Sequence, residues 1–135
     1  MDIKQQHLRI DRQYQRISMD TPCRAGLSGD KLSAARILNL SVGGLKFSCR
    51  RDAFHSMVPP DQRTPGRVVD VIIELDFELQ LPGQPPSVIN TRGTIIHSER
   101  LSQDEFHMGV QFTGMDEAAF RVLKAYVEER LSAQV

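Results

Sequence analysis

The segment from Val69 to Leu79 constrains the fold more than any other part of the sequence. Apolar residues occupy every second position in it, and most of the residues between them are acidic. A period of two is the period of a β-strand, in which successive side chains point to opposite faces of a sheet. The alternation therefore predicts a strand with one buried face and one hydrated face.

Five other segments show the same alternation and are predicted to be strands. They are residues 17–27, 35–38, 45–49, 88–97 and 106–112. Turn-forming residues separate the segments, as at Ser28-Gly29-Asp30 and in the proline-rich run 82–86. The less regular stretch 50–66 contains three prolines. We expect it to form a long surface loop with a helical turn at 53–57.

After Gly114 the apolar residues recur at intervals of three and four, which predicts a helix over about residues 115–131. Six antiparallel strands with one apolar face leave exposed edges unless the sheet curls and closes. We therefore expect a mainly β domain over residues 12–135. Its core is a six-stranded antiparallel barrel of the split-barrel kind, covered at one opening by the C-terminal helix. Residues 1–11 lack recurring apolar positions and are expected to form a flexible arm.

The composition narrows the class of protein. The chain has 135 residues, 40% of them hydrophobic and 25% charged, which is typical of one ordinary domain. Its 17 basic and 17 acidic residues give no net charge, which argues against binding to DNA, RNA or an anionic membrane. No signal peptide or membrane-length apolar run is present, so we expect a cytoplasmic protein without membrane insertion. Cys23 and Cys49 are interpreted as reduced core residues.

Two short segments carry candidate binding chemistry. Arg12 and Arg16 stand four positions apart just before the first strand, and Arg9 adds a third cation nearby. Guanidinium groups form forked hydrogen bonds with phosphate oxygens and with the O6 and N7 edge of guanine, and they stack on purines. Taken alone, however, such a pair is usually a solvated surface feature.

The second segment, residues 39–44, follows the second predicted strand and contains residues that are common in turns. Asn39 offers a donor and an acceptor, and Ser41 offers a hydroxyl. Gly43 and Gly44 permit positive φ angles and a close approach of a ligand to the main chain. Together the two segments supply what a nucleotide with phosphates and guanine bases requires.

The order Arg-x-x-x-Arg, strand, Asn-x-Ser-x-x-Gly, barrel and C-terminal helix resembles the PilZ domain family of bacterial cyclic di-GMP receptors. The resemblance covers roughly residues 9–131, and the segment 107–112 is similar to the last strand of that family. The family also accepts Asp at the position of Asn39, so an amide here replaces a carboxylate. The residues assigned to cyclic di-GMP by the resemblance are Arg12, Arg16, Asn39, Ser41 and Gly44, with Arg9 and Gly43 beside them.

The resemblance implies a receptor that relays cyclic di-GMP to a protein partner in motility, biofilm or related signalling. We hypothesise that the arm before Arg16 becomes ordered over the ligand and so creates a surface for the partner. The partner implied is a flagellar, pilus, polysaccharide-synthesis or signalling component. No cofactor is expected, because cyclic di-GMP is the regulatory ligand.

Other functions fit the sequence less well. No Gly-x-Ser-x-Gly or P-loop motif is present, so no enzyme activity is expected. The four histidines lack metal-ligand spacing, and no metal site is predicted. A barrel for single-stranded nucleic acid would need more aromatic residues than the 6% present. The alternative that stays open is a protein–protein adaptor of the same fold that acts without nucleotide.

Overall fold

The computed structural model describes residues 15–63 and 70–133. The expected arm at 1–11, together with Arg12, lies outside the described residues. The described elements, in chain order, are β1 (Ile17–Gly26), β2 (Ser33–Leu40), β3 (Gly44–Cys49), α2 (Arg51–Met57), the 3₁₀ helix η1 (Pro60–Gln62), β4 (Val71–Leu79), β5 (Ser87–Ser102), β6 (Glu105–Gly114) and α3 (Glu117–Ala133).

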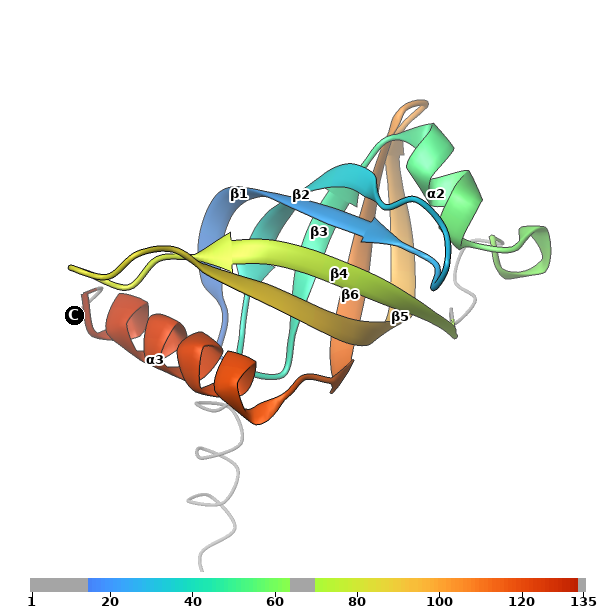
Figure 1. The fold of residues 1–135 in the computed structure, drawn as a ribbon. Coiled ribbons are helices and arrows are strands. Elements are labelled where there is room, and N and C mark those ends of the chain that lie inside the picture. Colours follow the sequence, from blue (N-terminus) through green and yellow to red (C-terminus); the bar gives the residue numbers. More distant parts are fainter. Residues whose placement is uncertain (1–14, 64–69, 134–135) are drawn as a thin grey trace, which may run out of the picture.

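The six strands close into one barrel, as the alternation predicted (Figure 1). Their order around the barrel is β1-β2-β3-β6-β5-β4, and every neighbouring pair is antiparallel. In β4 all the apolar residues of one parity are buried, from Val71 to Leu79. Closure gives each of these strands a partner on both sides, which removes the exposed edges of an open sheet.

Two strands are longer than their apolar pattern predicted. β2 continues through Asn39 to Leu40, and β5 continues past His97 to Ser102. The pairing of β5 with β6 contains register shifts, including one between Ile95 and His97. Each shift interrupts the period of two, so the alternation stops in the sequence although the strand goes on.

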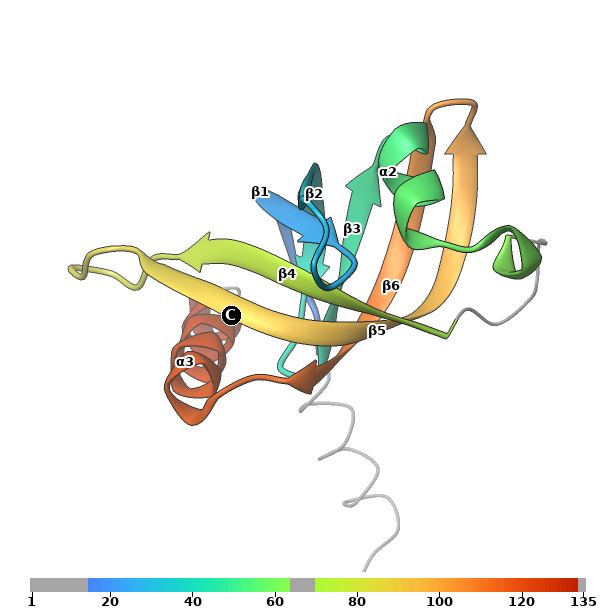
Figure 2. The same ribbon diagram turned by 45° about the vertical axis from the view of Figure 1, so that its right-hand side comes forward.

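Two helical elements occupy opposite ends of the barrel (Figures 1 and 2). α3 packs against β1, β4 and β5, with Leu123, Tyr126 and Val127 buried, so the predicted C-terminal helix is confirmed. α2 lies beside the β5–β6 hairpin and buries Phe54, whose ring stacks on Phe106 with a centroid separation of 4.1 Å. The stretch 50–63 is therefore more ordered than the predicted surface loop.

Both cysteines belong to the core, as predicted. Cys23 and Cys49 are free thiols with only 4% and 5% of their surface exposed. Burial raises the pKa of each thiol to about 12. At neutral pH both therefore stay protonated, and thiolate chemistry is suppressed.

Candidate functional site

The connection between β2 and β3 is built around the side chain of Ser41. This residue is 1% exposed, and its hydroxyl accepts hydrogen bonds from the backbone N–H groups of Gly43 and Gly44 at 3.3 and 3.1 Å. The Ser41 hydroxyl also donates to the Gly44 carbonyl at 3.2 Å, and the Ser41 N–H donates to the same oxygen at 2.8 Å. The serine thus holds the three-residue turn in one shape.

Gly44 is required by a close approach between strands. A Cβ atom at this position would lie 2.1 Å from the carbonyl oxygen of Val110, which is far inside van der Waals contact. Neither Gly43 nor Gly44 has a positive φ; among the described residues only Gly29 and Gly83 do. The expected use of positive φ at Gly43 and Gly44 is therefore wrong, and the packing of β3 on β6 is the reason for a glycine at position 44.

One hydrogen bond joins the two predicted motifs. Nη1 of Arg16 donates to Oδ1 of Asn39 at 2.7 Å. The strand register brings the residues together, because Ile17 pairs with Leu40 and Ser18 with Asn39. Arg16 itself is exposed. Its partner is a neutral amide, so this contact does not offset the positive charge of the guanidinium.

Beside this pair lies an open pocket of about 340 Å³. The lining residues are Arg16, Ser41, Gly43, Gly44, Ile96, Val110 and Gln111. Four of them belong to the predicted site, which confirms that Arg16 and the β2–β3 turn meet at one place on the surface. None of the lining residues is acidic. Counting the described residues alone, the pocket thus combines one cation that has no carboxylate partner with polar main chain and the 39% exposed Ile96.

The register reveals further residues that the sequence did not point to. Asn39 pairs with Lys46, Lys46 with Gly109, and Gly109 with His97, so these residues form one row across β2, β3, β6 and β5. The His97 imidazole lies directly over Gly109, where a Cβ atom would come within 2.0 Å of the ring. Lys46 places a second cation next to Asn39. A motif search cannot find Ile96, because only strand pairing brings it to the pocket.

Two other exposed arginines on the barrel have carboxylate partners. Arg24 binds Asp76 through two parallel bonds, Nε to Oδ1 at 3.0 Å and Nη2 to Oδ2 at 2.7 Å, and Arg36 pairs with Asp20. The paired carboxylate raises the pKa of each guanidinium. Such pairs satisfy the guanidinium fork and leave it less available to a phosphate. Arg16 differs from them because no carboxylate of the described residues pairs with it.

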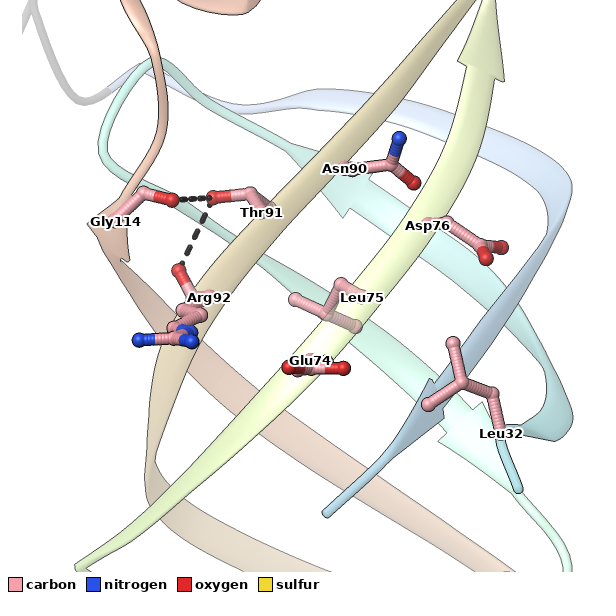
Figure 3. Close-up of a pocket in the computed structure, with 8 residues that line it drawn as sticks. All are labelled: Leu32, Glu74, Leu75, Asp76, Asn90, Thr91, Arg92 and Gly114. Atoms are coloured by element: carbon pink, nitrogen blue, oxygen red, sulfur yellow. Dashed lines mark hydrogen bonds between the residues drawn. The ribbon is translucent and has the colours of Figure 1, made fainter. Parts of the chain in front are cut away.

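A second pocket, of about 400 Å³, lies over β4 and β5 (Figure 3). It contains Glu74, which accepts a hydrogen bond from Ser28, and Asp76, which is bound to Arg24. Thr91 at its edge donates to the carbonyl oxygens of Arg92 and Gly114 (Figure 3). Two carboxylates and the absence of any predicted site residue make this larger pocket the poorer candidate for a phosphate ligand.

Residues 15–63 and 70–133 contain no group of three His, Cys, Asp or Glu side chains that could hold a metal ion. None of the helices in these ranges combines the length and the apolar character needed to cross a membrane. Arg9 and Arg12 precede the described residues, so their place relative to the pocket stays a prediction.

Comparisons with known proteins agree with this architecture. Solved structures of the same fold include the inhibitor of motility MotI (DgrA) of Bacillus subtilis, with a TM-score of 0.62 and 12% identity over 91% of this chain and 53% of that one. The PlzA protein of Borreliella burgdorferi in complex with c-di-GMP has a TM-score of 0.57 and 12% identity over 98% and 58%. The c-di-GMP-bound PilZ domain of Escherichia coli YcgR has a TM-score of 0.56 and 15% identity over 90% and 95%.

The chain thus spans a little over half the length of MotI and PlzA and nearly all of the YcgR domain. No curated protein matches it in sequence at a significant level. The sequence pattern of the PilZ domain, in contrast, matches residues 10–129, which is nearly the whole chain. The chain therefore belongs to the PilZ domain family.

Proposed function

We propose that this domain is a receptor for cyclic di-GMP and binds it at the pocket beside Arg16. The observation that carries the proposal is the 2.7 Å hydrogen bond between Arg16 and Asn39, which joins the two motifs next to an open pocket free of carboxylates. The PlzA protein and the YcgR domain, which share the fold, have been solved with c-di-GMP. Membership of the PilZ family supports the same ligand.

The chemistry of the pocket suits this ligand. Arg16, with Arg12 and Arg9 from the preceding segment, supplies guanidinium forks for phosphate oxygens and for the O6 and N7 edge of guanine. The amide of Asn39 is available to the polar edge of guanine that the arginines do not bind. Its hydrogen bond also orients the Arg16 side chain. Ser41 acts by fixing the turn that exposes Gly43, and Gly44 acts by letting the turn approach β6.

Isothermal titration calorimetry with cyclic di-GMP tests the proposal, with GTP and cyclic di-AMP as specificity controls. We expect heat with cyclic di-GMP, little with the other two, and a loss of affinity of about a hundredfold in Arg16→Ala, since a charge-assisted hydrogen bond contributes about 1.5–3 kcal/mol. Arg24→Ala is the matched control. Arg24 is also exposed and lies in β1, the strand that follows Arg16, but its guanidinium is bound to Asp76.

Two results would contradict the proposal. Equal heats for the three nucleotides would remove the guanine recognition assigned to the arginines. No heat for any nucleotide would favour the alternative, a PilZ-fold adaptor that binds a protein partner without nucleotide.

We further propose that ligand binding orders the segment before Arg16 and so relays the signal to a protein partner. The motivation is that the two parts of the site are far apart in the chain. Arg16 directly precedes β1, whereas Ser41, at the start of the turn that completes the site, comes 25 residues later. Hydrogen exchange measured at saturating cyclic di-GMP should show increased protection in residues 1–14. Unchanged exchange there, with binding intact by calorimetry, would exclude this relay without excluding the receptor function.

MotI, which shares the fold, is named an inhibitor of motility. This name supports a motility component as the partner.

A further inference from the structure

A second group of cations, two of them exposed and Arg63 half-buried, lies at the end of the barrel that carries α2, away from the pocket beside Arg16. Two arginines there cap a pair of stacked rings. The Cζ atom of Arg63 lies 6.0 Å from the centroid of Phe54, and that of Arg100 lies 5.7 Å from the centroid of Phe106. The two rings stack at 4.1 Å with planes 8° apart. The result is a ladder of guanidinium, ring, ring and guanidinium.

The main chain fixes both guanidinium groups in place. Arg63 donates from Nε to the Val58 carbonyl at 2.8 Å and from Nη2 to the His55 carbonyl at 2.9 Å. Arg100 donates from Nε to the Ser102 carbonyl at 3.0 Å. Both Nη groups of Arg100 and Nη1 of Arg63 have no hydrogen-bond partner among the described residues. Binding at these free donors therefore costs little side-chain entropy, because the groups are already held.

Asp104, whose carboxylate lies beside Arg51, is already engaged by other donors. Asp104 accepts hydrogen bonds from the Arg50 guanidinium and, through Oδ1, from the Arg51 N–H at 3.1 Å. Within residues 15–63 and 70–133, no ion pair involves the side chains of Arg51, Arg63 or Arg100. Partial dehydration and the charges of these three arginines together lower the pKa of His55 at the centre of the cluster, against the opposing effect of Asp52.

We propose that Arg51, Arg63 and Arg100 form a docking surface for an acidic segment of a partner protein. Carboxylates fit the free guanidinium donors in charge and geometry. Leu101, which is 49% exposed next to Arg100 on the β5–β6 hairpin, offers an apolar contact beside the cations. A segment with carboxylates around an aliphatic side chain therefore matches this surface.

A polynucleotide fits the same surface less well. Asp52 and the engaged Asp104 interrupt the positive charge, and the chain as a whole carries no net charge to attract a long polyanion. No row of exposed rings is available for base stacking, because Phe54 and Phe106 are only 4% and 5% exposed. α2 also lies at the opposite end of the barrel from the β2–β3 turn (Figures 1 and 2), so the inference stands without nucleotide binding.

A titration of the full chain with a synthetic peptide, Glu-Glu-Leu-Glu-Glu, followed by NMR, tests the proposal. We expect chemical-shift changes confined to residues 51–63 and 99–106, and an upward shift in the pKa of His55 as carboxylates approach. Removing two cations in Arg51→Gln/Arg100→Gln should weaken binding about tenfold, since each exposed ion pair contributes up to about 1 kcal/mol. Both substituted side chains are exposed, so the variant should fold, and its thermal unfolding midpoint checks this.

Arg121→Gln removes an exposed arginine from α3 at the other end of the barrel and should leave peptide binding unchanged. An uncharged Gln-Gln-Leu-Gln-Gln peptide should not bind. The proposal is overturned if the acidic peptide causes no shifts in these segments, or if the folded double variant binds it as tightly as the original chain. Tighter binding of a DNA duplex than of the peptide at the same residues would also overturn it and assign the surface to nucleic acid.

Discussion

The two ends of this barrel use different means to hold arginines that have no carboxylate partner among residues 15–63 and 70–133. At the β2–β3 turn, an amide aims Arg16 and the site depends on how closely the backbone of β3 can approach β6. At the α2 end, ring faces and main-chain carbonyls hold Arg63 and Arg100. Between the two ends, Arg24 and Arg36 are bound to aspartates. The kind of partner an arginine has, rather than its exposure, therefore indicates whether it is available to an anion.

The two ends of the barrel should also differ in how well they tolerate substitutions. The turn end is fixed by atoms in direct contact, so a single added methyl group should disturb it. The α2 end is held by side-chain contacts, namely stacked rings and arginine bonds to main-chain carbonyls, so it should accept conservative substitutions.

Gly44→Val should have the largest effect on stability. Its Cβ would meet the Val110 carbonyl oxygen, a backbone atom that cannot move alone, so we expect a loss of about 3 kcal/mol in the free energy of unfolding. Urea denaturation measures it. Gly29→Ala is the control: its φ is +85° but nothing lies within 4 Å of the added Cβ, so about 1 kcal/mol is expected. Equal losses in the two variants would disprove the tight approach at the turn.

Ser41→Ala should have the next largest effect. It removes the acceptor of two backbone N–H groups in a buried turn, which costs about 2 kcal/mol in the free energy of unfolding. Ser56→Ala at the α2 end removes one hydroxyl bond to a carbonyl at an exposed position and should cost less than about 0.5 kcal/mol. A similar cost at both serines would mean that the turn does not rely on Ser41.

Asp104→Asn should have the smallest effect, and that effect should depend on pH. The Arg51 N–H and the Arg50 guanidinium hold the pKa of Asp104 below its usual value, so its carboxylate stabilises the fold at neutral pH. This contribution is lost as the pH falls through the lowered pKa. The thermal midpoint of the original chain should therefore exceed that of Asp104→Asn at about pH 7, and the two should converge below about pH 3.

Asp30→Asn is the control for this titration, because no side-chain bond to Asp30 is present among the described residues. It should change the midpoint little at either pH. A difference between the original chain and Asp104→Asn that stays constant down to about pH 3 would contradict the role given to the carboxylate.

The sequence predicted most of the barrel, because a strand that buries one face has apolar and polar residues in alternation. β4 is the clearest case, since every apolar position of one parity is buried in it. The alternation did not predict the strand where pairing with the neighbouring strand continues but the side chains are not buried. Residues 98–102 of β5 are largely exposed, so no alternation marks the outer half of the β5–β6 hairpin. Helix α2 was predicted only as a turn, because its seven residues are too few to establish a helical period.

The candidate site was predicted in part. Local motifs identified Arg16, Asn39 and the turn, which the structure brings together. The same motifs could not show that Gly44 is required by the Val110 carbonyl oxygen, because that oxygen comes from a strand 66 positions away in the chain. Lys46 and Ile96 reach the site only through strand register, which depends on turns and bulges that the period of two does not encode.

We propose that the two ends of the barrel are separate sites and that only the end with Arg16 recognises cyclic di-GMP. A calorimetric titration of cyclic di-GMP into the original chain, Arg16→Ala and Arg100→Gln distinguishes the two ends. We expect a loss of about a hundredfold in affinity for Arg16→Ala and no change for Arg100→Gln. Unchanged affinity in Arg16→Ala, or an equal loss in Arg100→Gln, would show that the two ends do not differ in this way.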